Sequence, residues 1–195
     1  MDIGEEIISG CKNFRKEAQE ALYKFYAPKL KGICLRYSNQ KAEADEVLHE
    51  GFMKIFMRIE KYKGEGSFEG WMKKIMINTA INHFNKNKAY QLKFQLNNDD
   101  FPENKDETES PDDDSHNNVI ENADLSKEEI LEAVKSLPDG YRIIFNLYVI
   151  EGLKHREIAQ LLNINEGTSK SQLVRSRKML QKKLYELALS KNKKY

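Results

Sequence analysis

The run HREIAQLLNINEGTSKSQLVRSRKMLQKKL, residues 155–184, decides the fold of the C-terminal part of this chain. It combines a short apolar helix, a tight turn and a long basic helix. This layout is typical of a helix-turn-helix, whose second helix enters a DNA groove. Asn163 can adopt the left-handed conformation that the turn needs, and Asn165 is suited to cap the second helix. The run predicts a DNA-binding element; a basic solvated helix in an ordinary bundle is the alternative.

Two further helices are predicted before this run. Ser126 and Glu129 have the spacing of a capping box, which opens a helix through Lys135. Pro138, in a turn, is suited to the first position of the next helix, and Gly152 ends that helix. The positions that we expect to face the core are Ile143, Ile144, Leu147, Tyr148, Leu173, Leu180, Leu184 and Leu187.

The N-terminal part is also helical by its apolar spacing. Residues 14–37 have the helical period, although Pro28 is expected to kink or interrupt the helix. Residues 42–59 carry one continuous apolar stripe, from Val47 to Ile59. The opposite face of this second helix is polar, as solvated faces usually are. Its exposed residues are Asp45, Glu46, His49, Glu50 and Met53.

A third N-terminal helix begins near Ser67, which follows Gly64 and Gly66 and can act as the N-cap. Its inner face holds Trp71, which is more often a core residue than a platform for a base. The outer face interleaves amide and ammonium groups, which suit base edges and phosphates. That face carries Lys73, Lys74, Asn78, Asn82, Asn85 and Lys86.

The net charge of +1 is the sum of two basic blocks and the acidic block between them. Residues 1–98 contain 17 Lys and Arg against 12 Asp and Glu, and residues 125–195 contain 14 against 8. Residues 99–124 contain one Lys against 11 acids and almost no apolar side chains. Such a segment cannot bury enough surface to fold alone, which predicts a flexible acidic linker. It is either a plain tether, which composition alone favours, or a mimic of phosphate that occupies a basic channel on a partner or folds back onto the basic domains.

Several classes of protein are disfavoured. No apolar run approaches the ~20 residues of a membrane span, and no cleavable apolar segment follows the N-terminus, so we expect a cytoplasmic protein without membrane insertion. Cys11 and Cys34 lack metal-ligand spacing and are expected to be reduced thiols. The four histidines form no ligand cluster. No nucleophile, base and orienting group stand together, so we expect no enzyme, no metal and no cofactor.

Three segments taken in order resemble an extracytoplasmic-function (ECF) sigma factor of bacterial RNA polymerase. They are AEADEVLHEGFMKIF (42–56), SFEGWMKKIMINTAINHFNK (67–86) and the run at 155–184. The resemblance implies an all-α fold of two small helical domains joined by an acidic flexible linker. Residues 1–92 would be sigma region 2, residues 93–124 the linker, and residues 125–195 sigma region 4 with its helix-turn-helix.

The resemblance also implies roles for the polar faces of region 2. Helix 42–59 would dock on the clamp helices of core polymerase through Asp45, Glu46, His49, Glu50 and Met53. The family usually has Asp at the position of Glu46 and Gln at that of His49. Helix 67–88 would open the minus-ten element, with Asn78 and Asn82 holding an unstacked base of the melted non-template strand. Lys74 and Lys86 would contact the same DNA.

For region 4 the resemblance implies reading of duplex minus-thirty-five DNA by Lys170, Ser171, Val174 and Arg175, while the domain contacts the polymerase flap. Lys154 replaces the usual Ser or Thr cap, and Ser169 replaces a usual apolar residue. The linker would follow the active-site cleft and RNA exit path, which favours the phosphate mimic. An anti-sigma factor is a further candidate partner.

Two other classes of function compete with this interpretation. A stand-alone helix-turn-helix regulator would use the N-terminal helices for dimerisation or sensing, but such a module does not need the asparagine–lysine face at 73–86. A nucleic-acid enzyme with a DNA-binding tail is disfavoured by the missing carboxylate or metal constellation.

Overall fold

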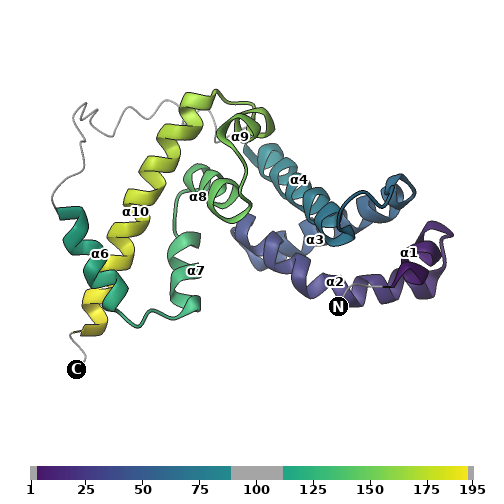
Figure 1. Cartoon of the computed structure of the whole chain (residues 1–195), viewed down its shortest axis with the longest axis horizontal. Coiled ribbons are helices and arrows are strands. Elements are labelled where there is room, and N and C mark those ends of the chain that lie inside the picture. Colours follow the sequence, from purple (N-terminus) through teal and green to yellow (C-terminus); the bar gives the residue numbers. More distant parts are fainter. Residues whose placement is uncertain (1–3, 89–111, 193–195) are drawn as a thin grey trace. The chain divides into compact units, whose positions relative to one another are not determined.

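The computed structural model describes residues 4–88 and 112–192, and every regular element within these ranges is a helix (Figure 1). The elements fall into two compact units. Helices α1 to α4 build the first unit and helices α6 to α10 the second. The all-α fold of two helical units agrees with the sequence prediction.

The first unit contains α1 (Glu5–Lys12), α2 (Lys16–Tyr37), α3 (Lys41–Arg58), the 3-10 turn η1 (Ile59–Lys61) and α4 (Phe68–Lys88). Helices α2, α3 and α4 pack on one another around an apolar core. Its largest fully buried side chains include Tyr26, Phe52, Ile55, Met72 and Met76. The apolar stripe predicted for residues 42–59 is the buried face of α3.

Two backbone features shape this unit. Helix α2 continues through Pro28, so of the predicted kink or interruption the interruption does not occur. The proline lacks an N–H and therefore removes one internal hydrogen bond, but the buried face of the helix is long enough to hold it together. Ser67 caps α4 as predicted, because its Oγ accepts a hydrogen bond from the Gly70 N–H at 2.9 Å. Gly64 and Gly66 before it have φ of 82° and 80°, which glycine adopts at no steric cost.

Both cysteines are buried thiols. Cys34 lies in the core at 0% exposure, and burial raises the pKa of its thiol from 9.0 to about 12. Burial also raises the pKa of Cys11. Both shifts have the sign expected for a group whose charged form is deprived of water.

The second unit contains α6 (Asp112–Asn122), α7 (Lys127–Lys135), α8 (Asp139–Phe145), the π-helical turn η2 (Asn146–Ile150), α9 (His155–Leu162) and α10 (Glu166–Asn192). Helix α10 contacts each of α6, α7, α8 and α9, so it is the spine of the unit. One apolar cluster joins α7 to the C-terminal half of α10. Its members are Ala133, Val134, Leu137, Leu180, Phe145, Met179, Leu184 and Leu187.

Helix α6 departs from the flexible linker that the sequence predicted up to residue 124. Residues 112–122 are helical, and α6 lies along the C-terminal half of α10 (Figure 1). The Gln181 side-chain amide donates to Asn117 Oδ1 at 3.0 Å. Composition could not predict this helix, because its stability depends on packing against α10. The earlier part of the predicted linker, residues 93–111, lies outside the described residues.

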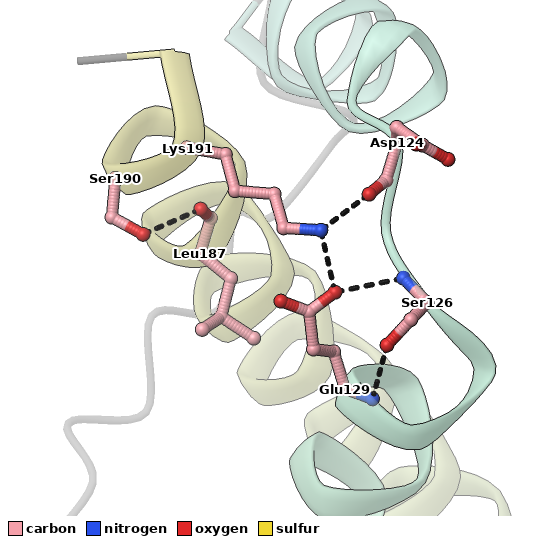
Figure 2. A network of polar contacts seen from close by, with 6 residues as sticks. All are labelled: Asp124, Ser126, Glu129, Leu187, Ser190 and Lys191. Carbon is pink, nitrogen blue, oxygen red and sulfur yellow. Dashed lines mark hydrogen bonds and ion pairs between the residues drawn. The ribbon is translucent and has the colours of Figure 1, made fainter. Parts of the chain in front are cut away.

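A polar network ties the end of α10 to the start of α7 (Figure 2). Ser126 and Glu129 form the predicted capping box, with the Ser126 N–H donating to Glu129 at 2.7 Å. Lys191 Nζ reaches the same carboxylate at 2.7 Å and also donates to the main-chain oxygen of Asp124. The Lys191 hydrogen bond is the largest cause that lowers the pKa of Glu129. Pro138 is the N-cap of α8 rather than its first helical residue, a shift of one position.

Candidate nucleic-acid interface

The turn between α9 and α10 has the predicted chemistry. Asn163 adopts the left-handed conformation with φ 54° and ψ 48°, and the Ile164 N–H returns to the Ala159 carbonyl at 3.0 Å. Asn165 Oδ1 accepts from the Thr168 N–H at 2.6 Å and thereby caps α10. Glu157 accepts from the Lys154 N–H at 2.8 Å. A full capping box also needs an N-cap side chain that accepts a hydrogen bond. The lysine side chain has no acceptor, so Lys154 forms only this one bond of the two.

The first three turns of α10 present the four predicted reading residues to solvent. Lys170, Ser171, Val174 and Arg175 are all exposed, and Val174 is 52% exposed although it is apolar. An exposed aliphatic group among cationic and hydroxyl groups suits the methyl group and acceptors of a base-pair edge. Lys170 also forms an ion pair with Glu166 at 2.8 Å, and this hydrogen bond lowers the pKa of Glu166.

The opposite side of the same turns is buried and partly polar. Ser169 is 0% exposed, and its Oγ lies 2.9 Å from Nδ1 of His155. The His155 ring stacks on Tyr148, with ring centroids 4.5 Å apart and planes at 24°. The Arg177 guanidinium lies over the other ring of this stack, 5.8 Å from the Tyr148 centroid. The serine at a position where the family usually has an apolar residue is the sequence signal of a buried polar partner.

The polar face of α4 lies on one side of the helix, because Lys74, Asn78 and Asn82 follow each other at intervals of four residues. Lys74 and Asn82 are exposed and Asn78 is half-buried. The Lys86 side chain lies outside the described residues. Thr79 faces inward, where its hydroxyl donates to the Ile75 carbonyl at 2.9 Å.

The base of α4 is an aromatic cluster. The Trp71 ring stacks on Phe68 with centroids 5.6 Å apart, and Tyr62 lies 5.5 Å from Trp71. Trp71 is half-buried in this cluster rather than fully buried in the core. This cluster supports the N-terminal end of the helix that carries the amide face.

On α3 the predicted docking residues point outward. Asp45, Glu46, His49 and Met53 are exposed, Glu50 is half-exposed, and Met53 is 51% exposed. Met53 is thus an exposed apolar side chain on a face that is otherwise mostly carboxylate.

The acids of this face lie close to basic side chains of the same unit. Lys31 Nζ lies 2.6 Å from Asp45, and Lys54 Nζ lies 2.6 Å from Glu50. His83 of α4 stands 3.6 Å from Glu46. Ion pairs at an exposed surface contribute about 0–1 kcal/mol, so a basic partner can replace them at small cost.

Within the described residues, no group of three or more His, Cys, Asp or Glu side chains could hold a metal ion. Among the helices of the same ranges, none combines the length and the apolar character that crossing a membrane requires.

Family models match both units. The model of sigma-70 region 2 matches residues 22–90, and the model of sigma-70 region 4 matches residues 127–180. The first match covers α2 from residue 22, α3 and α4, and the second covers α7, α8, α9 and α10 up to residue 180. Helix α6 lies outside both matches.

Curated relatives match almost the full length. The ECF RNA polymerase sigma-E factor of Haemophilus influenzae is 26% identical over 187 residues, which covers 94% of this chain and 96% of the relative. The ECF RNA polymerase sigma factor SigW of Bacillus subtilis is 27% identical over 184 residues, or 90% and 95% of the two chains. The sigma factor RpoE from Bartonella quintana, solved with the anti-sigma factor NepR, aligns at a TM-score of 0.49 and 18% identity, covering 89% and 97%.

Proposed function

The chain belongs to the extracytoplasmic-function (ECF) sigma factors, and we propose that it holds promoter DNA at two points, one on each helical unit. A sigma factor binds core RNA polymerase, directs it to promoters and helps to open the DNA. Sigma factors are initiation factors without an enzymatic activity of their own, since RNA synthesis belongs to the polymerase.

Helix α10 is the proposed reader of the minus-thirty-five element. Its exposed residues Lys170, Ser171, Val174 and Arg175 lie within the first three turns, and the N-terminal part of a recognition helix is the part that contacts base edges. Arg175 can donate two hydrogen bonds to a guanine, and Val174 suits a thymine methyl. This exposed face on a capped, two-helix turn is the observation that carries the proposal.

Helix α4 is the proposed site of minus-ten opening. Asn78 and Asn82 offer amide groups on one face of the helix, the first half-buried and the second exposed. Lys74 and Lys86 would neutralise the adjacent phosphates. Holding an unstacked base offsets part of the cost of melting, which is how a protein without an energy source can open a duplex.

Helix α3 is the proposed docking surface for the clamp helices of the polymerase, through Asp45, Glu46, His49, Glu50 and Met53. The ion pairs of Asp45 and Glu50 support this role, because they hold the carboxylates outward until a basic partner arrives. The second unit would contact the polymerase flap. Once both units are fixed on the polymerase, two weak DNA contacts act together at high effective concentration.

The acidic range between the units is the proposed polyanion that follows the basic cleft and exit path of the polymerase. Its final part, α6, packs on α10 and so belongs with the second unit in this structure. The segment available to follow the polymerase would therefore be the part before residue 112. An anti-sigma factor is the proposed negative regulator.

Transcription in vitro tests the proposal. Purified protein and bacterial core polymerase are incubated with fragments of the source genome, and start sites are mapped. We expect a small set of starts that share two elements and that are absent without the protein. The protein alone should bind these promoters weakly. Tight binding without polymerase, or no specific starts with it, would overturn the proposal and favour a stand-alone regulator.

A further inference from the structure

The reading helix α10 is attached to one aromatic stack at two places. Near its start, the buried Ser169 hydroxyl meets His155 Nδ1 at 2.9 Å. Eight residues later, Arg177 lies over the Tyr148 ring. His155 and Tyr148 stack on each other, so one rigid pair of rings holds both points. We propose that the His155–Ser169 hydrogen bond sets the orientation of α10 and is thereby a positioning element for minus-thirty-five recognition.

The two attachment points bracket the reading residues. Lys170, Ser171, Val174 and Arg175 all lie between Ser169 and Arg177. Eight residues span about 12 Å of helix. The packing of α10 on α6, α7, α8 and α9 fixes its axis, and the two attachments add a restraint on its roll beside the reading residues. A roll of a fraction of a turn would displace every reading side chain from the base edges.

Burial gives the hydrogen bond its importance. Ser169 is 0% exposed, so water does not replace a lost partner at its Oγ. A buried hydroxyl left unpaired is destabilising, whereas two apolar groups of similar shape at the same place can be nearly neutral. Either tautomer of His155 can form the bond, since Nδ1 accepts from the hydroxyl or donates to it.

The stack that holds the histidine depends on an irregular turn. Tyr148 lies in the π-helical turn η2, Asn146–Ile150, directly after α8. The wider turn alters the direction of the side chain relative to a regular helix, and short π-helical turns occur often at functional sites. Two residues after this turn, Gly152 has φ 71°, and the chain then leads into α9.

The inference rests on the proposed function and is tested on a promoter mapped with the wild-type protein. Two templates are compared: the promoter itself, and a derivative whose minus-thirty-five element is scrambled. The variants are Ser169→Ala, His155→Phe and the double variant. Phenylalanine retains a ring on Tyr148 but has no nitrogen. Ser176→Ala is the matched control, because Ser176 is also 0% exposed but bonds within its own helix, to the Leu173 carbonyl at 2.7 Å.

Each single variant should lower transcription from the intact promoter about 3- to 10-fold, the effect of one buried hydrogen bond. Neither should change transcription from the scrambled template. The double variant should lose no more than the weaker of the two single variants, because either change alone already removes the bond that positions α10. The Ser176→Ala control should stay within about twofold of wild type on both templates, because its bond is confined to one helix.

Three results would overturn the positioning role. They are multiplicative losses in the double variant, equal losses on the two templates, or single variants that transcribe like wild type. Melting temperatures of all variants are measured alongside, and a loss of promoter use that follows melting temperature rather than the template also counts against it. If wild-type protein directs no specific transcription, the proposed function fails instead, so the two failures are distinguishable.

Discussion

Gly51 of α3 faces Met76 of α4 so closely that a Cβ at position 51 would stand 2.4 Å from the Met76 sulfur. Met76 is fully buried in the core. The glycine therefore allows the docking helix and the DNA-opening helix of the first unit to approach each other. A change at this contact would therefore alter the positions of both proposed surfaces, the one on α3 and the one on α4.

Gly51→Ala should lower the free energy of unfolding of the first unit by about 1 kcal/mol. Overpacking a buried site costs about 1–3 kcal/mol, and the better helix propensity of alanine offsets about 1 kcal/mol of that cost. Trp71 is the one tryptophan of the chain, so its fluorescence in urea reports this unit. Gly32→Ala is the matched control: Gly32 is also helical, but a Cβ added there would have no neighbouring atom within 4 Å. It should stabilise by about 0.5–1 kcal/mol, and equal signs for the two changes would refute the close contact.

Much of the local structure was predictable because it depends on neighbouring residues. Ser67, Ser126 and Asn165 cap their helices as their spacing indicates, and Asn163 takes the left-handed turn. These features need only a few adjacent backbone groups and a short polar side chain. The buried face of α3 follows in the same way from helical periodicity.

The remainder depends on contacts between distant residues. Helix α6 exists on the surface of α10, and its acidic composition argued for an unfolded segment. The bond of His155 to Ser169 joins residues 14 apart and requires the π-helical turn that presents Tyr148. Helix α2 passes through Pro28 because its buried face outweighs one missing hydrogen bond. No local pattern contains this information.

The cap of α7 should carry measurable stability. Ser126→Ala removes the Oγ that accepts from the Glu129 N–H at 3.2 Å and should cost about 1 kcal/mol. Hydrogen exchange should show faster exchange at the start of α7, while α4 is unchanged. Ser190→Ala is the control, since Ser190 bonds only to its own helix in Figure 2, at the Leu187 carbonyl. Uniform acceleration across the second unit would instead mean that the cap holds the whole unit.

Stability of the first unit should fall in alkali through Cys34. Burial raises the pKa of this thiol from 9.0 to about 12, so the native state keeps a proton that the unfolded state loses. The stabilisation is therefore complete below pH 9 and declines as the pH rises toward 12, by about 1.4 kcal/mol per pH unit. Urea unfolding at about pH 8 and about pH 10, on either side of the unfolded pKa, measures the slope. Cys34→Ala should be less stable at the lower pH but should lose less on going to the higher one; parallel slopes would refute the assignment.

Asn78→Ala and Arg175→Ala should fail at different steps of initiation. Arg175 is exposed on the reading face of α10, so its loss should weaken promoter binding by about 1–3 kcal/mol. Asn78 is half-buried on α4, so its loss should leave binding intact and reduce opening by about tenfold, the effect of removing the partner of an unstacked base. Permanganate detects unpaired thymines, and DNase footprinting detects binding, on one mapped promoter.

The two defects can be separated by varying the concentration of polymerase and protein. Raising polymerase and protein together should restore permanganate reactivity for Arg175→Ala, because mass action compensates for weak binding. It should not restore reactivity for Asn78→Ala, since occupied promoters would still fail to open. On the scrambled minus-thirty-five template, Arg175→Ala should match wild type, whereas Asn78→Ala should remain defective. If both variants responded alike to concentration and template, α4 and α10 would not act at separate steps. Each unit would then contribute only to promoter binding and not to opening.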